Sequence, residues 1–313
     1  MSSINIHNLG KPTSESLTWI ENITGKKIDS EQIKKLPGGT SSLVFEIPFS
    51  AESSHEPLVL RLFNDQEWLE MEPDLAKHES ESLKRAVLSK VSTPVLIASD
   101  ETGEKCGLPA VLMSKLPGEP KLHAADLDTW LDQMAKTLVG IHQVEAEGFN
   151  FEYFSYNEAL RLDKPLWSKV PEEWLRAIFI VAGIRPTAPL HFIHRDYHPA
   201  NILWENEEIT GVVDWVNSCV GPAGIDVGHC RVNLAQLHGI TAADKFLEFY
   251  RQHAGSAFEY NPYWDLLSLT DTLDGPPKVY KGWTELGMRG LSDELIRHRL
   301  DEYLLSLLRR FDD

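Results

Sequence analysis

The densest group of side chains able to carry out chemistry lies just past the middle of the chain. Asp196 is followed five residues later by Asn201, and Asp214 comes thirteen residues after Asn201. The runs 202–204 and 209–215 are short and apolar, which predicts the two strands of a hairpin. A hairpin of this length returns Asp214 to the neighbourhood of Asn201. We therefore expect two carboxylates and an amide oxygen in one small space.

Oxygen ligands of this kind suit Mg²⁺, which usually takes one or two protein carboxylates together with substrate phosphates. The carboxylate on the loop, Asp196, can receive the proton of a hydroxyl group. Metal-holding oxygens and a base that orients a nucleophile are the parts that phosphoryl transfer needs. For any single aspartate a capping role in a polar loop is the simpler interpretation, but the whole constellation favours chemistry.

The run from His194 to Asn201, His-Arg-Asp-Tyr-His-Pro-Ala-Asn, resembles the catalytic loop of the protein-kinase-like fold. More closely, it is similar to the loop of the aminoglycoside phosphotransferase family, which includes choline-kinase-like enzymes. The resemblance implies Asp196 as the catalytic base, Asn201 and Asp214 as the residues that hold Mg²⁺, and His198 beside the transferred phosphate.

The same resemblance implies an α+β fold with two lobes, a small antiparallel β-sheet lobe and a larger, mainly helical lobe. It implies an ATP-dependent small-molecule kinase that transfers the γ-phosphate to a hydroxyl of a small acceptor, with an aminoglycoside-like or other cationic compound as one acceptor class. By this resemblance, residues 1–113 form the β-rich nucleotide-binding lobe, 114–118 the hinge, and 119–313 the catalytic and substrate lobe. The hinge residues expected against adenine are Met113, Ser114 and Leu116.

Two further positions fit a nucleotide site. The segment 37–42 (Pro-Gly-Gly-Thr-Ser-Ser) precedes a strand-like run and is expected to cover the phosphates, with contacts from Gly39, Thr40 and Ser41. A cation on the next strand should meet the phosphates, and that position falls on Arg61, where protein kinases use lysine. An arginine inside an apolar run needs an acidic partner if it is buried.

The helix expected over residues 74–90 offers that partner. Glu79 falls on the apolar face of this helix, where a carboxylate needs a cation, so Glu79 is the expected partner of Arg61. Glu81 falls on the side with the basic residues, where a solvated pair explains it, and is the second choice. The apolar face otherwise consists of Leu75, Leu83 and Val87.

The chain after Asp214 bears on the class of kinase and on the acceptor. Asp226 follows twelve residues later, and a similar aspartate in the family supports the catalytic loop, so we expect a structural role for Asp226. The short gap leaves no room for a long activation loop, which argues against a protein kinase. The helical C-terminal region is expected to bind the acceptor, with candidate contacts Asp265, Asp271, Asp274, Trp283 and Glu285.

Two other functions compete with this reading. A metal-dependent hydrolase is suggested by His194, Asp196 and His198, three potential zinc ligands within five residues. That alternative leaves Asn201 and Asp214 without a role. A non-catalytic nucleotide-binding module is the other, and the joint presence of the three oxygen-bearing residues argues against it.

Composition narrows the class of protein. The 313 residues carry 30 Lys+Arg against 47 Asp+Glu, a formal net charge of −17, which argues against a nucleic-acid partner. No window approaches the roughly 18 consecutive apolar residues of a membrane span, and the N-terminal residues do not read as a secretory signal. Three scattered cysteines are expected to be reduced, buried thiols of a cytoplasmic protein.

The elements that must position the candidate site follow from hydrophobic periodicity. Helices are expected over 13–24 and 126–145, from Pro171 onward, and at the C-terminus, where the apolar stripe is Ile296, Leu300, Tyr303, Leu304 and Leu307. Further strands are expected over 42–47, 58–63, 94–98 and 109–113.

Overall fold

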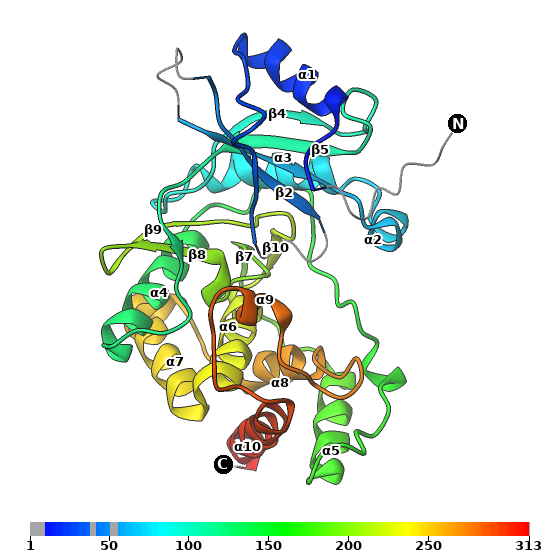
Figure 1. The fold of residues 1–313 in the computed structure, drawn as a ribbon. Coiled ribbons are helices and arrows are strands. Elements are labelled where there is room, and N and C mark those ends of the chain that lie inside the picture. The colour runs from blue at the N-terminus through cyan, green and yellow to red at the C-terminus, as the bar shows by residue number, and fades with distance from the viewer. Residues whose placement is uncertain (1–9, 38–41, 51–55, 313) are drawn as a thin grey trace.

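The computed structural model describes residues 10–37, 42–50 and 56–312. The chain forms two stacked parts, a small antiparallel sheet with helices beside it and a larger, mainly helical part that contains the C-terminus (Figure 1). This is the two-lobed α+β architecture that the sequence predicts. The residues expected to cover the phosphates, Gly39, Thr40 and Ser41, lie outside the described residues.

The sheet of the smaller part consists of β1 (Lys34–Lys35), β2 (Leu43–Ile47), β3 (Leu58–Leu62), β4 (Leu96–Asp100) and β5 (Ala110–Ser114). The order in the sheet is β1-β2-β3-β5-β4, and every neighbouring pair is antiparallel. In β2 the residues Leu43, Phe45 and Ile47 are buried and those between them are less so, because alternate side chains of a strand point to opposite faces. These buried side chains join one hydrophobic cluster with Trp19 and Ile20.

Trp19 and Ile20 come from helix α1 (Ser14–Thr24), which lies above the sheet at the top of Figure 1. The hydroxyl of Thr13 accepts a hydrogen bond from the backbone N–H of Ser16 and so caps the start of the helix. The helix ends where Gly25 adopts a left-handed φ of 67°, which glycine does without steric cost. The predicted bounds differ from these by one residue.

Helices α2 (Gln66–Met71) and α3 (Leu75–Ala86) follow β3. Leu75, Glu79 and Leu83 of α3 are buried, as their shared face predicts. The expected continuation to residue 90 is wrong, because the helix ends at Ala86. Val87 is consequently 51% exposed instead of belonging to the buried face.

The larger part contains α4 (Leu127–His142), α5 (Pro171–Ala182), α6 (Ala223–His238), α7 (Ile240–Ala254), α8 (Pro262–Thr270), α9 (Lys281–Glu285) and α10 (Asp293–Asp312). Its short strands are β6 (Glu119–Pro120), β7 (Leu190–Ile193), β8 (Ile202–Glu205), β9 (Glu208–Val212) and β10 (Cys219–Pro222). β6, β8 and β9 form one sheet, and β7 pairs with β10. The predicted apolar stripe of α10 is buried throughout.

Helix α6 lies at the centre of the larger part and is almost entirely buried. It approaches α8 closely at two glycines. A Cβ atom at Gly224 would lie 2.4 Å from the Trp264 ring, and one at Gly228 would lie 2.7 Å from both the Trp264 carbonyl oxygen and the Ser268 hydroxyl. Glycine at these positions therefore sets the distance between the two helices.

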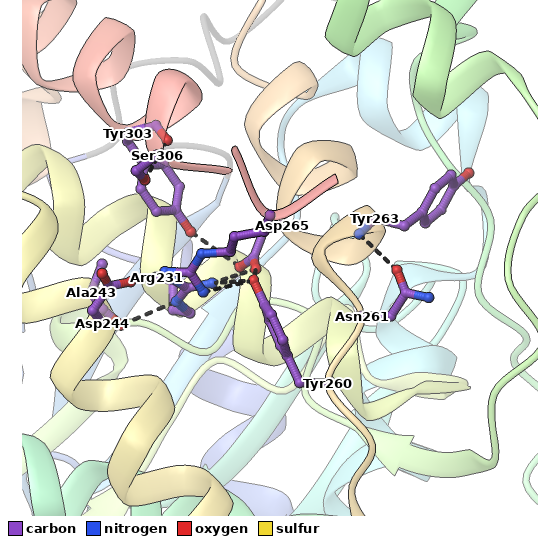
Figure 2. Close-up of polar contacts among 10 residues, drawn as sticks. Arg231, Ala243, Asp244, Tyr260, Asn261, Tyr263, Asp265, Tyr303 and Ser306 are labelled. Atoms are coloured by element: carbon purple, nitrogen blue, oxygen red, sulfur yellow. Dashed lines mark hydrogen bonds and ion pairs between the residues drawn. The ribbon is translucent and has the colours of Figure 1, made fainter. Parts of the chain in front are cut away.

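A buried ionic network fixes α6 to the C-terminal helices (Figure 2). The guanidinium of Arg231 contacts Asp265 of α8, donates to Asp244 of α7 at 2.6 Å and to the Ala243 carbonyl oxygen at 3.0 Å. Tyr303 of α10 donates to the other Asp265 oxygen at 3.1 Å. A fully buried guanidinium is tolerated because its donors meet acceptors from several helices.

Burial overturns two of the expected acceptor contacts. Asp265 is 1% exposed and is bound on both oxygens, so it cannot contact an acceptor. Trp283 is 2% exposed and packs in the core of the larger part. Burial of an acid was unexpected because its partner Arg231 lies 34 residues away in the chain.

Among the described helices, none is both long and apolar enough to cross a lipid bilayer. The three cysteines are buried free thiols, Cys106 against the smaller part's sheet, and Cys219 and Cys230 in the larger part's core. Burial is the main cause that raises the pKa of all three thiols.

The close approach of α6 to α8 predicts that Gly228→Ala lowers the free energy of unfolding by about 1–3 kcal/mol, because the new methyl group meets a backbone oxygen that cannot move aside. Urea denaturation would measure the change. Gly10→Ala is the control, since a Cβ there meets no atom within 4 Å. Equal stability of Gly228→Ala and the wild type would contradict this account of the packing.

Candidate active site

The loop that carries Asp196 is held by a carboxylate from α6. Asp226 accepts the backbone N–H groups of His194 at 2.8 Å and of Arg195 at 2.6 Å, one on each side-chain oxygen. Arg195 has a φ of 66°, a left-handed conformation that is costly for a residue with a side chain. The two hydrogen bonds to Asp226 keep the loop in this conformation.

Asp226 is itself completely buried and paired. His142 of α4 meets its Oδ2 atom at 2.9 Å, and the other nitrogen of the same ring lies 2.6 Å from the Tyr250 hydroxyl. Burial alone would raise the pKa of Asp226, but the His142 contact and the loop amides outweigh it, so the pKa lies below its ordinary value. The expected structural role of Asp226 agrees with these contacts.

Both ring nitrogens of His194 are engaged, one within the loop and one by the residue that follows β9. Nδ1 accepts the backbone N–H of Asp196 at 3.3 Å, so the neutral ring carries its proton on Nε2 and donates it to the Val213 carbonyl oxygen at 3.0 Å. No nitrogen remains for a metal ion. The zinc set His194, Asp196 and His198 expected for a hydrolase is therefore not formed.

The carboxylate of Asp196 is contacted on both oxygens. Asn201 donates to Oδ2 at 3.1 Å and to the Asp196 backbone oxygen at 2.9 Å. His229 Nε2 lies 3.1 Å from Oδ1, whereas His198 Nε2 is 3.6 Å away. Burial would raise the pKa of Asp196, but the neighbouring imidazoles of His198 and His229 outweigh it and hold the pKa well below its ordinary value.

Asp214 lies beyond the end of β9 rather than at the close of a strand, with a left-handed φ of 68°. The backbone N–H of its neighbour Val213 donates to the Asn201 carbonyl oxygen at 2.9 Å. The hairpin β8–β9 thus brings Asn201 and Asp214 together, as their spacing predicts. Arg195 and Asp214, two strained residues, flank this region.

Arg61 joins the smaller part to this region. Its Nη1 atom donates to Glu79 Oε1 and to Asp214 Oδ1, both at 2.8 Å. The expected Arg61–Glu79 ion pair is confirmed, and the second choice, Glu81, instead makes an exposed pair with Lys84. Burial raises the pKa of Glu79, and Arg61 opposes that rise.

The residues present suit a metal-bound triphosphate. The buried Nε of Arg61 has no hydrogen-bond partner among the described residues, so this N–H is left for a ligand. The side-chain amide nitrogen of Asn201 donates to Asp196, so the side-chain oxygen of Asn201 is left for a metal ion. The Asp214 side chain is 30% exposed, so one of its oxygens can be reached. Carboxylate and amide oxygens are ligands that Mg²⁺ accepts.

The expected hinge connects the two parts. Residues 114–118 run from the end of β5 to β6, which pairs with β8 of the larger part. Met113 is buried at the end of the sheet, and Ser114 is tied to Val95 by two hydrogen bonds. Leu116 is half-buried. The adenine contacts expected of these residues stay predictions.

Two residues of the segment 68–78, Glu72 and His78, also join the smaller part to the larger part. Glu72 accepts hydrogen bonds from Trp68 at 2.9 Å and from the hydroxyl of Tyr156 at 2.8 Å. His78 of α3 lies 2.6 Å from the Ser218 carbonyl oxygen and stacks on Phe151 with 3.7 Å between ring centroids. Together with Arg61, these contacts fix the sheet against the larger part.

The three remaining acceptor candidates, Asp271, Asp274 and Glu285, differ in their electrostatic contacts. Asp274 and Glu285 are exposed, and Glu285 pairs with Lys281 at 3.3 Å. Asp271 lies directly after α8, within electrostatic reach of His229. Loss of water around its carboxylate raises the pKa of Asp271 to about 6, and the positive charge of His229 opposes this rise. Asp271 thus interacts electrostatically with His229, which contacts Asp196.

His229 and the aromatic residues around Arg195 lie at the site without having been predicted from the sequence. His229 stands three residues after Asp226 on α6, and this spacing places both on one helix face, which was the available signal. The Arg195 guanidinium lies 4.2 Å from the Tyr156 ring centroid and 4.4 Å from that of Phe154. No motif marks these aromatic residues in the sequence.

Comparisons with known proteins bear on the family and the fold of the chain. The profile of the phosphotransferase enzyme family (APH) matches residues 32–263. A search of curated proteins found no match. Several solved structures share the fold.

One is macrolide 2′-phosphotransferase MphH from Brachybacterium faecium, with 18% identity, a TM-score of 0.58, and coverage of 93% of this chain and 98% of that one. A thermostable mutant of aminoglycoside phosphotransferase APH(4)-Ia, in ternary complex with AMP-PNP and hygromycin B, has 15% identity, a TM-score of 0.61, and coverage of 94% and 99%. Amicoumacin kinase hAmiN, in a complex that contains AMP-PNP and Ca²⁺, has 14% identity, a TM-score of 0.59, and coverage of 94% of both chains.

The support of the loop by Asp226 predicts that Asp226→Asn lowers the free energy of unfolding at neutral pH by about 3 kcal/mol, because a buried charged acceptor of two N–H groups is lost. The lowered pKa gives the sign of the pH dependence. The ionised carboxylate stabilises the wild type above pH about 4, and this contribution is lost as the pH falls through the lowered pKa. Denaturation from pH 7 to pH 2 should show the two proteins converging, and a constant difference would contradict this.

Proposed function

We infer that this chain, which belongs to the phosphotransferase enzyme family and is a small-molecule kinase acting on hydroxyl groups, uses ATP and Mg²⁺. The observation that carries the proposal is the convergence of Asp196, Asn201, Asp214 and Arg61, linked by hydrogen bonds into one region between the two parts. These are the groups that phosphoryl transfer needs: an orienting base, metal ligands and a cation for the phosphates.

In this proposal the smaller part and the hinge hold the nucleotide. Arg61, fixed by Glu79 and Asp214, donates its unpartnered Nε–H to a phosphate oxygen. Met113, Ser114 and Leu116 border the adenine, and Gly39, Thr40 and Ser41 cover the phosphates. Residues 1–113 then act as the nucleotide lobe, 114–118 as the hinge and 119–313 as the catalytic and substrate lobe.

Asn201 and Asp214 would hold Mg²⁺ through their side-chain oxygens. The bound ion offsets the negative charge that develops on the phosphate oxygens during transfer. His198 adds a donor beside this region. Because its Nδ1 accepts the backbone N–H of Ala200, the neutral ring carries its proton on Nε2. Burial lowers the pKa of His198 to about 4, so the ring is neutral at pH 7.

Asp196 orients the acceptor. Its carboxylate is ionised at neutral pH and accepts a hydrogen bond from the acceptor hydroxyl, which points the hydroxyl oxygen at the γ-phosphorus. A bond forms between that oxygen and the phosphorus, and the bond from the phosphorus to the β–γ bridging oxygen breaks. The hydroxyl proton passes to the carboxylate and then to solvent.

For the acceptor we propose an aminoglycoside-like or other cationic compound. An accessible acid, Asp271, lies within electrostatic reach of the Asp196 region. The chain also carries a net charge of −17, which attracts cations over a long range. Enzymes of the same fold act on chemically different compounds, among them a macrolide and amicoumacin. Because the fold does not define the acceptor, screening is needed to identify it.

The role of Asp196 predicts that Asp196→Asn lowers kcat by about 10²–10⁴, the usual contribution of a general base. The assay follows label from γ-labelled ATP into a panel of amino sugars, choline, macrolides and sugar alcohols. Asp128→Asn, which removes an exposed acid of α4 that pairs with Lys245, is the matched control and should retain wild-type activity. Nucleotide binding without transfer to any acceptor would instead favour the non-catalytic module.

The role of Asp214 predicts a change in metal-dependent nucleotide binding. AMP-PNP at 100 times its Kd should stabilise the wild type by about 2.7 kcal/mol, with a larger rise in Tm when Mg²⁺ is present. Asp214→Asn should lose the Mg²⁺-dependent part of this rise. A Tm shift that depends on Mg²⁺ equally in both proteins would be evidence against Asp214 as a metal ligand.

A further inference from the structure

The proposed catalytic carboxylate is held by two donors from different parts of the chain. Asn201, on the same loop, donates to Oδ2 of Asp196, and His229, on α6, meets Oδ1 at 3.1 Å. Since each oxygen has its own partner, rotation of the carboxylate about its Cβ–Cγ bond would break both contacts. A carboxylate has about four lone-pair positions, so an acceptor hydroxyl can still bind.

His198 does not duplicate this contact. Its Nε2 lies 3.6 Å from Asp196 Oδ1, which is beyond hydrogen-bond distance. Its Nδ1 is already bound to the backbone N–H of Ala200. Of the two imidazoles beside Asp196, therefore, only that of His229 lies within hydrogen-bond distance of the carboxylate.

His229 is itself held in place. Asn233, one turn later on α6, donates to the His229 carbonyl oxygen at 2.9 Å. Asp226, one turn earlier, binds the loop backbone. The same buried helix therefore positions both the backbone of the loop and the carboxylate that the loop carries.

The charges around His229 strengthen its contact. Burial would lower the pKa of His229, but the carboxylates of Asp196, Asp226 and Asp271 outweigh it and raise the pKa above its ordinary value. His229 is therefore more often protonated than a free histidine at neutral pH. A hydrogen bond from an imidazolium to a carboxylate is charge-assisted and shorter and stronger than a neutral one.

We propose that His229 is a positioning residue that holds the Asp196 carboxylate in the orientation in which it receives the acceptor hydroxyl. This inference rests on the proposed role of Asp196. His229 lies about one-third exposed, so the contact forms at the edge of the region that solvent and small molecules reach. Misplacement of a catalytic group by about 1 Å costs roughly a hundredfold in rate, which sets the scale of the effect.

The test compares His229→Leu with His229→Gln, whose amide nitrogen can replace Nε2 as a donor. We expect His229→Leu to lower kcat about 10- to 100-fold with an unchanged KM for ATP, and His229→Gln to recover most of the loss. His253→Leu is the matched control, because it breaks another histidine–aspartate contact, to Asp132 at 2.7 Å, on the surface. This control should retain wild-type kcat.

A second measurement is independent of activity. In a crystal structure of His229→Leu, the Asp196 carboxylate should be rotated or in two orientations, whereas in His229→Gln it should be as in the wild type. Full kcat in His229→Leu, an unmoved carboxylate, or an equal loss in both variants accompanied by a lower Tm would each overturn the proposal. Activity that survives Asp196→Asn would instead refute the proposed function, so the two failures are distinguishable.

Discussion

The structure of the site depends on one buried carboxylate. Asp226 binds two consecutive N–H groups of the loop and is held from behind by His142, so the strained turn at Arg195 is fixed from α6 and α4. Without a charged acceptor at this place, two backbone donors would be buried unsatisfied, which costs more than the bonds contribute when made. The position of α6 therefore determines the conformation of the loop, because Asp226 binds the loop backbone from this helix.

Helix α6 in turn lies where its neighbours allow. Gly224 and Gly228 bring it against Trp264, and Arg231 anchors it to α7 and α8. Arg61 extends the connection to the sheet, because one nitrogen atom binds both Glu79 and Asp214. The guanidinium of Arg61 thus links the smaller part to Asp214, in addition to the contacts that Glu72 and His78 make with the larger part.

Local patterns were enough to predict much of this arrangement. The spacing of Asp196, Asn201 and Asp214 predicted their convergence, and helical periodicity selected Glu79 over Glu81. The predictions failed for residues whose burial depends on a partner that is distant in the sequence. Asp265 is buried because Arg231 reaches it from another helix, and Trp283 belongs to the core, neither of which composition reveals. His229 was missed because a lone histidine on a helix carries no signal until the helix is placed against the loop.

The three cysteines give this protein a built-in means of following its own motions. Thiols react as thiolates, and a pKa of about 12 for Cys106 and Cys219 leaves almost none of that form while the core is closed. Labelling would therefore occur only during transient opening. Cys106 lies in the core of the smaller part, and Cys219 and Cys230 lie in the core of the larger part. Mass spectrometry could therefore measure the rate of labelling, and so of opening, in each part separately and without an introduced probe.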